Sequence, residues 1–253
     1  MSELPDNLSI YDSTWGSWLD MKRYGPASRW LRKLIKDACL DLPTPPASIH
    51  DVGCGVGTNT TFLSELFPLA DVRGSDFSST AISVATQFCT ANKITFVHDP
   101  DNRALERTAD MVCCFEVLEH VDDWKAFLEK LAGASERFVL LSFPTGRMRP
   151  FEVNVGHLRN FQPGEVESAM RELSYTPLSL AYAGFPFYSP IYRNLCQITN
   201  AGDAQFTRGT YGLGRRLLSS AIYFSFRYLS LQRKHGDQFV GLFEKNKASS
   251  EVR

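Results

Sequence analysis

The sequence has no excess of charge of either sign and no long apolar run. It holds 27 Lys and Arg residues against 28 Asp and Glu residues, which leaves a formal net charge of −1 at pH 7. A nearly neutral chain has no global field that draws it to a polyanion, so we do not expect a nucleic-acid partner. No stretch reaches the roughly 20 apolar residues of a membrane-spanning helix. Repeats and low-complexity segments are also absent.

Cysteine pairs of the CxxC type are missing as well. The six cysteines lie mostly in apolar runs without regular spacing, which excludes a zinc knuckle and indicates small core residues in a reducing compartment. The first residues, MSELPDNLSIYDSTW, have neither the basic start nor the apolar core of a secretion signal. We therefore expect a cytoplasmic protein.

What the sequence does contain is an alternation of apolar and helical segments typical of an α/β fold. Residues 11–40 predict two short helices broken at Gly25-Pro26, and we interpret residues 1–44 as an N-terminal helical lid. From residue 45 to 253 we expect one domain in which short strands alternate with helices, which is typical of a parallel sheet. The predicted strands are 48–52, 71–76, 94–98, 109–115, 136–143, 176–183 and 238–243. The predicted helices between them are 57–67, 78–91, 121–132 and 163–173, with a loop from Pro144 to Phe161.

Residues 185–235 interrupt this alternation and form a helical, aromatic-rich insertion. Within it, residues 217–231 are mostly apolar and have basic residues on both sides. The segment is too short for a spanning helix. One interpretation is a helix packed on the domain; the other is a peripheral membrane or partner contact through residues 215–234.

A glycine-rich turn follows the first predicted strand. In Asp51-Val-Gly53-Cys-Gly55, glycine lets the backbone turn sharply and lie against a ligand, while the next helix presents free N–H groups. Thr58 stands where a dinucleotide motif has its third glycine. The turn therefore indicates a nucleotide-like ligand.

An acid in register with this turn narrows the ligand. Asp76 ends the second predicted strand, where a carboxylate can accept both hydroxyls of a ribose. With Asp99 after the third strand and Phe115-Glu116 after the fourth, the sequence resembles the class I S-adenosylmethionine (SAM)-dependent methyltransferases. This resemblance implies a Rossmann-like, seven-stranded, mostly parallel sheet with helices on both faces and the last strand antiparallel.

The resemblance also implies cofactor roles for particular residues. The methionine part of SAM would lie at Asp51, Gly53 and Gly55, the ribose at Asp76 beside Phe77, and the adenine near Asp99 and Phe115. Asp101 is an alternative to Asp99.

A further group of side chains follows the fourth strand. In a helical turn Glu116, Glu119 and His120 would share one face, and His157 lies in the loop after the fifth strand. The pattern resembles plant small-RNA 2'-O-methyltransferases and ubiquinone-pathway O-methyltransferases. That implies a divalent metal (Mg, Mn or Zn) held by Glu116, Glu119, His120 and His157. Without a metal, Glu116 borders the SAM pocket and His157 is the first choice as general base.

The methyl acceptor is less defined. The aromatic residues of the N-terminal helices and of the Phe185-Pro-Phe-Tyr188 segment would form a lid suited to sugars or flat rings; the alternative is that they belong to the core. Together with the resemblance above, this leads us to expect an O-methyltransferase acting on a small molecule or glycan. The alternatives are an RNA 2'-O-methyltransferase, an N- or C-methyltransferase without metal, and a SAM-binding regulatory subunit. Arg147, Arg149 and Arg159 are candidates for binding a phosphate or carboxylate of the acceptor. No feature indicates an oligomeric state.

Overall fold

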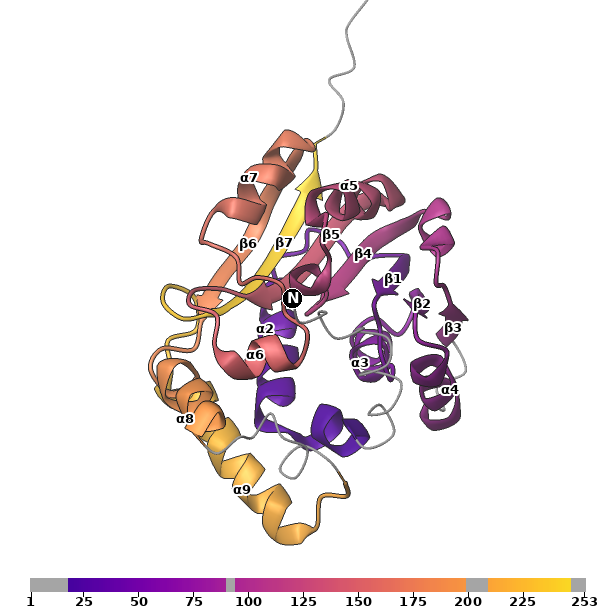
Figure 1. The fold of residues 1–253 in the computed structure, drawn as a ribbon. Coiled ribbons are helices and arrows are strands. Elements are labelled where there is room, and N and C mark those ends of the chain that lie inside the picture. The colour runs from indigo at the N-terminus through magenta and orange to yellow at the C-terminus, as the bar shows by residue number, and fades with distance from the viewer. Residues whose placement is uncertain (1–17, 90–93, 199–208, 247–253) are drawn as a thin grey trace, which may run out of the picture.

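The computed structural model describes residues 18–89, 94–198 and 209–246, and these form a central seven-stranded sheet (Figure 1). Its strand order is β3-β2-β1-β4-β5-β7-β6, and β7 alone runs antiparallel, to both of its neighbours. The expected Rossmann-like fold is confirmed. The strands are β1 (Ser48–Val52), β2 (Asp71–Asp76), β3 (Ile94–His98), β4 (Ala109–Phe115), β5 (Ser135–Pro144), β6 (Tyr175–Ala183) and β7 (Gln238–Lys245).

The middle of the sheet is apolar on both faces. All seven residues of β4 are buried, because helices cover the strand from above and below. One face packs against α5 (Trp124–Ala134) and α7 (Glu165–Glu172), and the other against α2 (Pro26–Cys39) and α3 (Thr58–Leu66). Helix α4 (Ser79–Phe88) also packs against the sheet, along β2 and β3.

Helix α2 belongs to the core, which corrects the expectation of a lid over residues 1–44. Trp30 and Ile35 are fully buried and pack with Phe138 and Leu242 of the sheet. The reason is that the apolar residues of this helix form one continuous stripe, and the sheet face below needs a cover. Trp18, Met21 and Lys22 of the preceding helical residues 18–24 line the cavity described below, as do Ala27, Ser28 and Leu31 at the start of α2. Trp15 lies outside the described residues.

Helix ends follow local capping signals. Ser78 caps α4 by accepting the amide of Ala81, and Asp123 caps α5 by accepting the amide of Ala126. The predicted start of α5 at residue 121 was three residues early, because Leu118–His120 form a separate 3₁₀ turn, η2, and the capping aspartate follows it.

The connections contain more structure than we expected. The predicted loop 144–161 holds α6 (Pro150–Asn154), which begins with a proline, and the side chain of Glu152 in its first turn accepts the amide of Arg149. A 3₁₀ turn η1 (Arg103–Glu106) lies before β4. The expected insertion consists of η3 (Phe187–Tyr192), α8 (Arg193–Ile198), α9 (Leu213–Phe224) and η4 (Ser225–Leu229).

All six cysteines are free thiols. Within residues 18–89, 94–198 and 209–246, no helix has the length and apolar character needed to cross a membrane.

Candidate active site

A cavity of about 680 Å³ opens at the carboxyl ends of β1, β2 and β4. Its wall continues through η2, α6 and η3, so segments far apart in the chain enclose one space. A cavity of this size holds a cofactor-sized ligand, and its position at the strand ends is where α/β folds bind ligands. The expected residues on its wall are Gly53, Gly55, Asp76, Phe77, Asp99, Phe115, Glu116, Glu119, His120 and His157.

The glycine turn has the backbone conformation that its sequence predicts. Gly53 and Gly55 have φ angles of 72° and 53°, in the left-handed region that other residues rarely adopt. A Cβ atom on Gly53 would lie 2.4 Å from Cγ2 of Val117. Glycine is therefore required here both by conformation and by the close approach of η2.

Asp76 ties this turn to the second strand. Its Oδ2 accepts the amide of Gly55 at 2.8 Å, and its Oδ1 accepts the amide of Ser78 at 2.9 Å. The carboxylate is 5% exposed and lies on the cavity wall. The residue expected to bind the ribose is thus also the residue that positions the glycine turn.

Asp99 has a similar arrangement one strand further. Its two oxygens accept the amides of Arg103 at 2.7 Å and Ala104 at 2.9 Å, at the start of η1. Asp99 lines the cavity, whereas the alternative Asp101 has a side chain 63% exposed and pairs with Arg103. The structure favours Asp99 over Asp101.

Asp51 does not line the cavity. Its buried carboxylate lies behind the glycine turn and accepts the hydroxyl of Thr60 at 2.6 Å, across to α3. Burial raises the pKa of Asp51 to about 7. The carboxylate of Asp51 is therefore not exposed to the cavity where we expected it to contact the methionine part of SAM. Instead it joins β1 to α3.

Glu116 lies apart from the other expected metal ligands. It follows β4 with a φ of 57°, and its Oε1 accepts the hydroxyl of Ser142 and the side-chain amide of Gln238, each at 2.8 Å. The chain continues into a 3₁₀ turn rather than an α-helix, so the assumed helical face does not form. This corrects the four-ligand set: Glu116 anchors β4 to β5 and β7.

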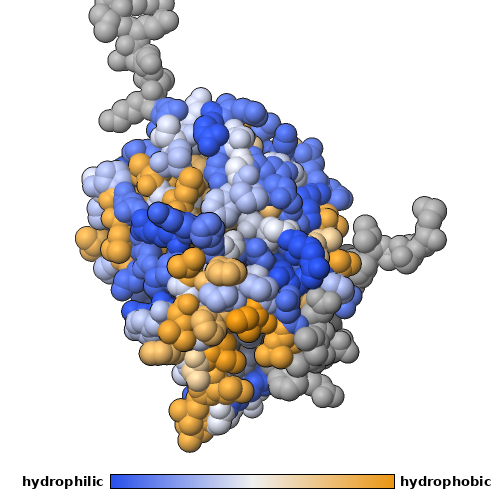
Figure 2. All heavy atoms as spheres, turned by 90° about the vertical axis from the view of Figure 1, so that its left-hand side faces the viewer, coloured by the Kyte–Doolittle hydropathy of each residue, from blue (hydrophilic) through white to orange (hydrophobic). Residues whose placement is uncertain are grey.

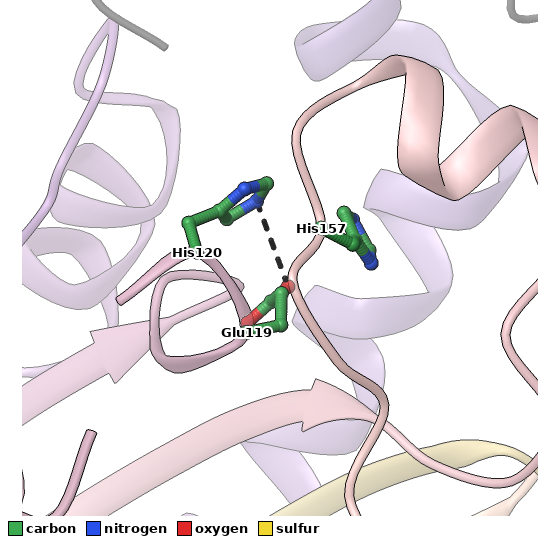
Figure 3. A group of neighbouring side chains, drawn as sticks. All are labelled: Glu119, His120 and His157. Carbon is green, nitrogen blue, oxygen red and sulfur yellow. Dashed lines mark ion pairs between the residues drawn. The ribbon is translucent and has the colours of Figure 1, made fainter. Parts of the chain in front are cut away.

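The other three side chains do gather. The ligand atoms of Glu119, His120 and His157 all lie within 4.8 Å of one another. Figure 3 shows Glu119 and His120 projecting from the turn after β4, with His157 across from them on the loop after α6. The two imidazole rings meet edge to face, with centroids 4.7 Å apart. Neither carboxylate oxygen of Glu119 has a hydrogen-bond partner within the described part of the chain, although the side chain is fully buried.

Backbone contacts hold the two histidines in place. Nδ1 of His120 lies 2.9 Å from the carbonyl oxygen of Gly156, so the neutral ring donates its Nδ1 proton there and keeps a lone pair on Nε2. The amide of Leu158 donates to the carbonyl of Glu119, which joins the two loops.

Burial controls the ionisation of this cluster. It lowers the pKa of His120 to about 4 and that of His157 to about 3, so both rings are neutral at pH 7. Burial, together with the nearby Glu116, raises the pKa of Glu119 well above its usual range. A general base at neutral pH needs the proton affinity of an ordinary histidine, and the buried ring of His157 binds a proton much less readily.

Two of the three arginines in the loop after β5 already use their guanidinium groups within the protein. Arg149 is buried and donates to Asn194 and Ser189, and Arg159 donates to the backbone carbonyls of Val121 and Asp122. We expected these two residues to bind a phosphate or carboxylate of the methyl acceptor, but their guanidinium groups have structural contacts instead. Arg147 is exposed.

Sequence reasoning missed three further residues of the cavity wall. Lys22 lines the cavity from the helical residues 18–24 that precede α2. Burial lowers the pKa of Lys22, while the nearby carboxylates of Glu116 and Glu119 raise it. Arg193 and Glu152 form a buried ion pair on the wall. They come from η3–α8 and α6, 41 residues apart, so no local motif could have indicated them.

The other histidines have structural contacts. His50 is buried in β1 and lies 2.8 Å from the hydroxyl of Ser75 and 3.1 Å from Arg73. His98 lies 3.0 Å from the carbonyl of Phe77.

The strand order, the glycine turn and the acid after β2 together define the Rossmann-like fold of SAM-dependent methyltransferases. Comparison with known proteins agrees: residues 50–135 match the family model of a methyltransferase domain.

Two curated relatives match part of the chain. Malonyl-[acyl-carrier protein] O-methyltransferase of Bacillus anthracis is 32% identical over 84 residues, which is 33% of this chain and 31% of that protein. An uncharacterized Synechococcus protein is 29% identical over 129 residues, 46% of this chain and 31% of that protein. The chain thus spans about a third of the length of these relatives.

Solved structures extend the likeness to nearly the whole chain. Magnesium protoporphyrin IX methyltransferase from Synechocystis PCC 6803, solved with bound S-adenosylhomocysteine (SAH), covers 95% of this chain at 16% identity, with all of that chain matched and a TM-score of 0.57. The [4+2]-cyclase SpnF covers 95% of both chains at 12% identity, with a TM-score of 0.61. Since the second of these is a cyclase, likeness at this level shows the fold and leaves the reaction to the site.

Proposed function

We propose that this protein is a SAM-dependent methyltransferase that transfers the methyl group to a hydroxyl of a small molecule or glycan. The observation that carries this proposal is the single cavity that joins the glycine turn and Asp76 to Glu119, His120 and His157. A donor and an acceptor need adjoining subsites, and this cavity supplies residues suited to both.

The donor half would bind SAM through the β1 and β2 ends. The glycine turn allows close approach of the methionine part, Asp76 accepts the ribose hydroxyls, and the adenine lies between Phe77 and Phe115 with Asp99 at its edge. The match of residues 50–135 to a methyltransferase domain supports this assignment, because the turn and Asp76 and Asp99 fall inside it.

The reaction would form a bond between the acceptor oxygen and the methyl carbon while the bond from that carbon to sulfur breaks. The electron pair of the broken bond stays on sulfur, which yields neutral SAH, and the hydroxyl proton passes to solvent water. A neutral, buried His157 is a weak base for that proton. The name of the Bacillus anthracis relative supports oxygen as the accepting atom.

A divalent cation is the finer part of the proposal. Glu119, His120 and His157 fit one, because their ligand atoms lie within 4.8 Å and both oxygens of the buried Glu119 lack hydrogen-bond partners among the described residues. Two imidazoles and a carboxylate suit Zn or Mn, and Mg less well. Bound there, a cation would lower the pKa of an acceptor hydroxyl. His120 would offer Nε2, since Nδ1 is directed at Gly156.

The metal assignment is tested by chelation and by substitution. We expect EDTA to abolish methyl transfer, and Mn or Zn to restore it. His157→Ala should remove activity and weaken binding of Mn or Zn while SAM affinity stays near wild type. The matched control is His235→Ala, because His235 is exposed and outside the cavity. Full activity in chelator would end the metal proposal, and loss of SAM binding in His157→Ala would show that the residue is misplaced.

An RNA 2'-O-methyltransferase is the second candidate, and the Glu119, His120 and His157 cluster favours it. The near-zero net charge opposes it, because affinity for RNA rests largely on phosphate contacts. A methyl-donor assay with catechols, sugars, lipid-linked glycans and short RNA separates the candidates. Transfer to nitrogen or carbon alone would refute O-methylation. Free thiols fit a reducing compartment, and we place the reaction in the cytoplasm.

A further inference from the structure

Helix α9 and the turn η4 expose an apolar stripe that the fold does not use. Leu213, Leu217, Phe224 and Tyr228 are 77%, 63%, 56% and 60% exposed. Their spacing of four, seven and four residues places them on one side of a helix. Figure 2 shows apolar surface gathered at the lower end of the molecule, where α8 and α9 lie in Figure 1. Leu218, Leu229, Ile191 and Leu195, each at least half exposed, also belong to this surface.

The opposite side of the same helix already serves the core. Ser219 and Phe226 are buried, and Tyr223 stacks under the guanidinium of Arg29 from α2. Most surface helices have one apolar side and one charged side, as α5 does, where Lys125 and Glu129 face away from the core. Helix α9 is apolar on both sides, so its outer stripe needs another explanation.

The charges on the segment that carries this stripe are all positive. Between residues 209 and 236 the sequence has five basic residues and no acidic residue. Arg227 and Lys234 are exposed, and Arg216 lies over the ring of Tyr24. The five are Arg215, Arg216, Arg227, Arg233 and Lys234. From the neighbouring α2, Arg29 adds to the positive charge. The acidic groups beside this surface are Asp41, which pairs with Arg233 at 3.6 Å, Asp20, which accepts the amide of Tyr211, and Asp37, whose charge acts on Arg227.

We propose that α9 and η4 dock this protein on the surface of an anionic lipid bilayer. An exposed apolar stripe flanked by basic residues is the pattern of a helix that lies in the membrane interface. The basic residues would meet anionic headgroups while Leu217 and Phe224 enter the acyl boundary. The helix lies on the bilayer and does not cross it, in line with its length.

Charge argues against a second copy of the chain on this surface. A twofold dimer through α9 would place the same patch on both sides, so the basic residues of the two copies would face one another. An anionic surface is complementary to them instead.

The docking surface is in contact with the wall of the cavity. Phe226 of η4 packs against Tyr188 and Tyr192 with ring centroids 5.4 Å and 5.1 Å apart, and both tyrosines line the cavity. A docked protein would thus hold this wall close to the bilayer. The proposal does not rest on methyl transfer, because it concerns binding alone.

Flotation of the full chain with lipid vesicles tests the proposal. We expect the protein to float with vesicles containing phosphatidylglycerol and to stay behind with phosphatidylcholine alone. The double variant Leu217→Ser, Phe224→Ser should bind at least about tenfold more weakly, because two large apolar side chains no longer enter the lipid. The double variant Arg227→Gln, Lys234→Gln should bind about thirtyfold more weakly, at roughly 1 kcal/mol per charge.

The matched control is Leu69→Ser, since Leu69 is 92% exposed in the turn before β2 and outside the stripe. Circular dichroism melting shows that each variant is folded, which is expected because the substituted side chains are exposed. Absence of flotation with anionic vesicles, or unchanged flotation of the Leu217, Phe224 variant, overturns the proposal. The proposal is also overturned if the wild-type protein is a dimer and the Leu217, Phe224 variant is a monomer, because a second copy would then occupy the surface.

Discussion

Asp76 and Asp99 offer a matched pair for testing the cofactor site. Each is buried, lines the cavity and accepts two backbone amides, with distances of 2.7 to 2.9 Å. Our assignment gives them different ligands: Asp76 the ribose hydroxyls and Asp99 the edge of the adenine. Replacing either aspartate by asparagine disturbs the same kind of backbone contact. A difference between the two variants in affinity for the cofactor therefore reports on the ligand contacts.

The structural cost should be alike in the two variants. Asparagine has one acceptor oxygen and one NH₂ group, so one of the two backbone amides loses its partner. A lost bond to a charged acceptor costs about 2 kcal/mol. In a domain of this size that lowers the melting temperature by about 4 to 8 °C.

The affinity for SAH should differ between them. Asp76→Asn loses one charge-assisted bond to the ribose, worth about 1.5 to 3 kcal/mol, so Kd should rise roughly 10- to 100-fold. Asp99→Asn keeps an oxygen that can accept from the adenine amino group, so its Kd should rise less, by roughly an order of magnitude.

Calorimetric titration with SAH measures both values, and thermal melts without ligand measure the structural cost. An equal rise of Kd in the two variants would mean that the loss comes from the loosened backbone and that Asp76 does not contact the ribose. An unchanged Kd in Asp76→Asn would refute the placement of the cofactor itself.

Two further substitutions test the glycine turn and the aspartate behind it. Gly53→Ala should lower the free energy of unfolding by about 2 to 4 kcal/mol, because a left-handed φ costs 1 to 3 kcal/mol and the new Cβ meets Val117; an unchanged urea midpoint would contradict this. The pKa of Asp51 is about 7 in the folded protein and about 3.9 in the unfolded chain, so between these pH values the folded state holds a proton that the unfolded chain has lost. The contribution of Asp51 to stability therefore falls as the pH rises from 4 to 7. Asp51→Asn has no group that titrates here, so its stability does not fall across this range, and its side-chain oxygen still accepts from Thr60. Its free energy of unfolding relative to wild type should therefore rise by up to about 4 kcal/mol between pH 4 and pH 7, at about 1.4 kcal/mol per pKa unit. Urea melts without ligand at pH 4 and pH 8 measure the gain, and a constant difference between the two proteins would refute the raised pKa.

Local signals in the sequence determined the sheet. Six of the seven strands have the predicted bounds to within one residue, because apolar runs of this length between turn residues have few other solutions. The glycine turn was readable for the same reason: only glycine adopts the φ angles at 53 and 55 without strain. Asp76 could be placed because a parallel sheet brings the ends of consecutive strands to one edge.

Tertiary structure decided which side chains meet. Glu116 and Glu119 are three residues apart and seemed equivalent, yet the chain turns at Glu116 and sends its carboxylate to Ser142 and Gln238. The ion pair of Arg193 with Glu152 joins segments that share no local pattern. Such partners depend on how distant loops fold over the strand ends, and no spacing in the sequence encodes that distance.

The same division applies to charge and exposure. The sequence identifies His157 as a histidine, but burial, with His120 beside it, lowers the pKa of His157 to about 3 and so weakens it as a base. Likewise, the apolar run 217–231 had two interpretations until packing showed Phe226 directed inward and Phe224 outward. The sequence by itself determined the elements and the glycine turn, because these rest on local backbone preference. The environment of each side chain, and hence its chemistry, arises only when the elements pack together.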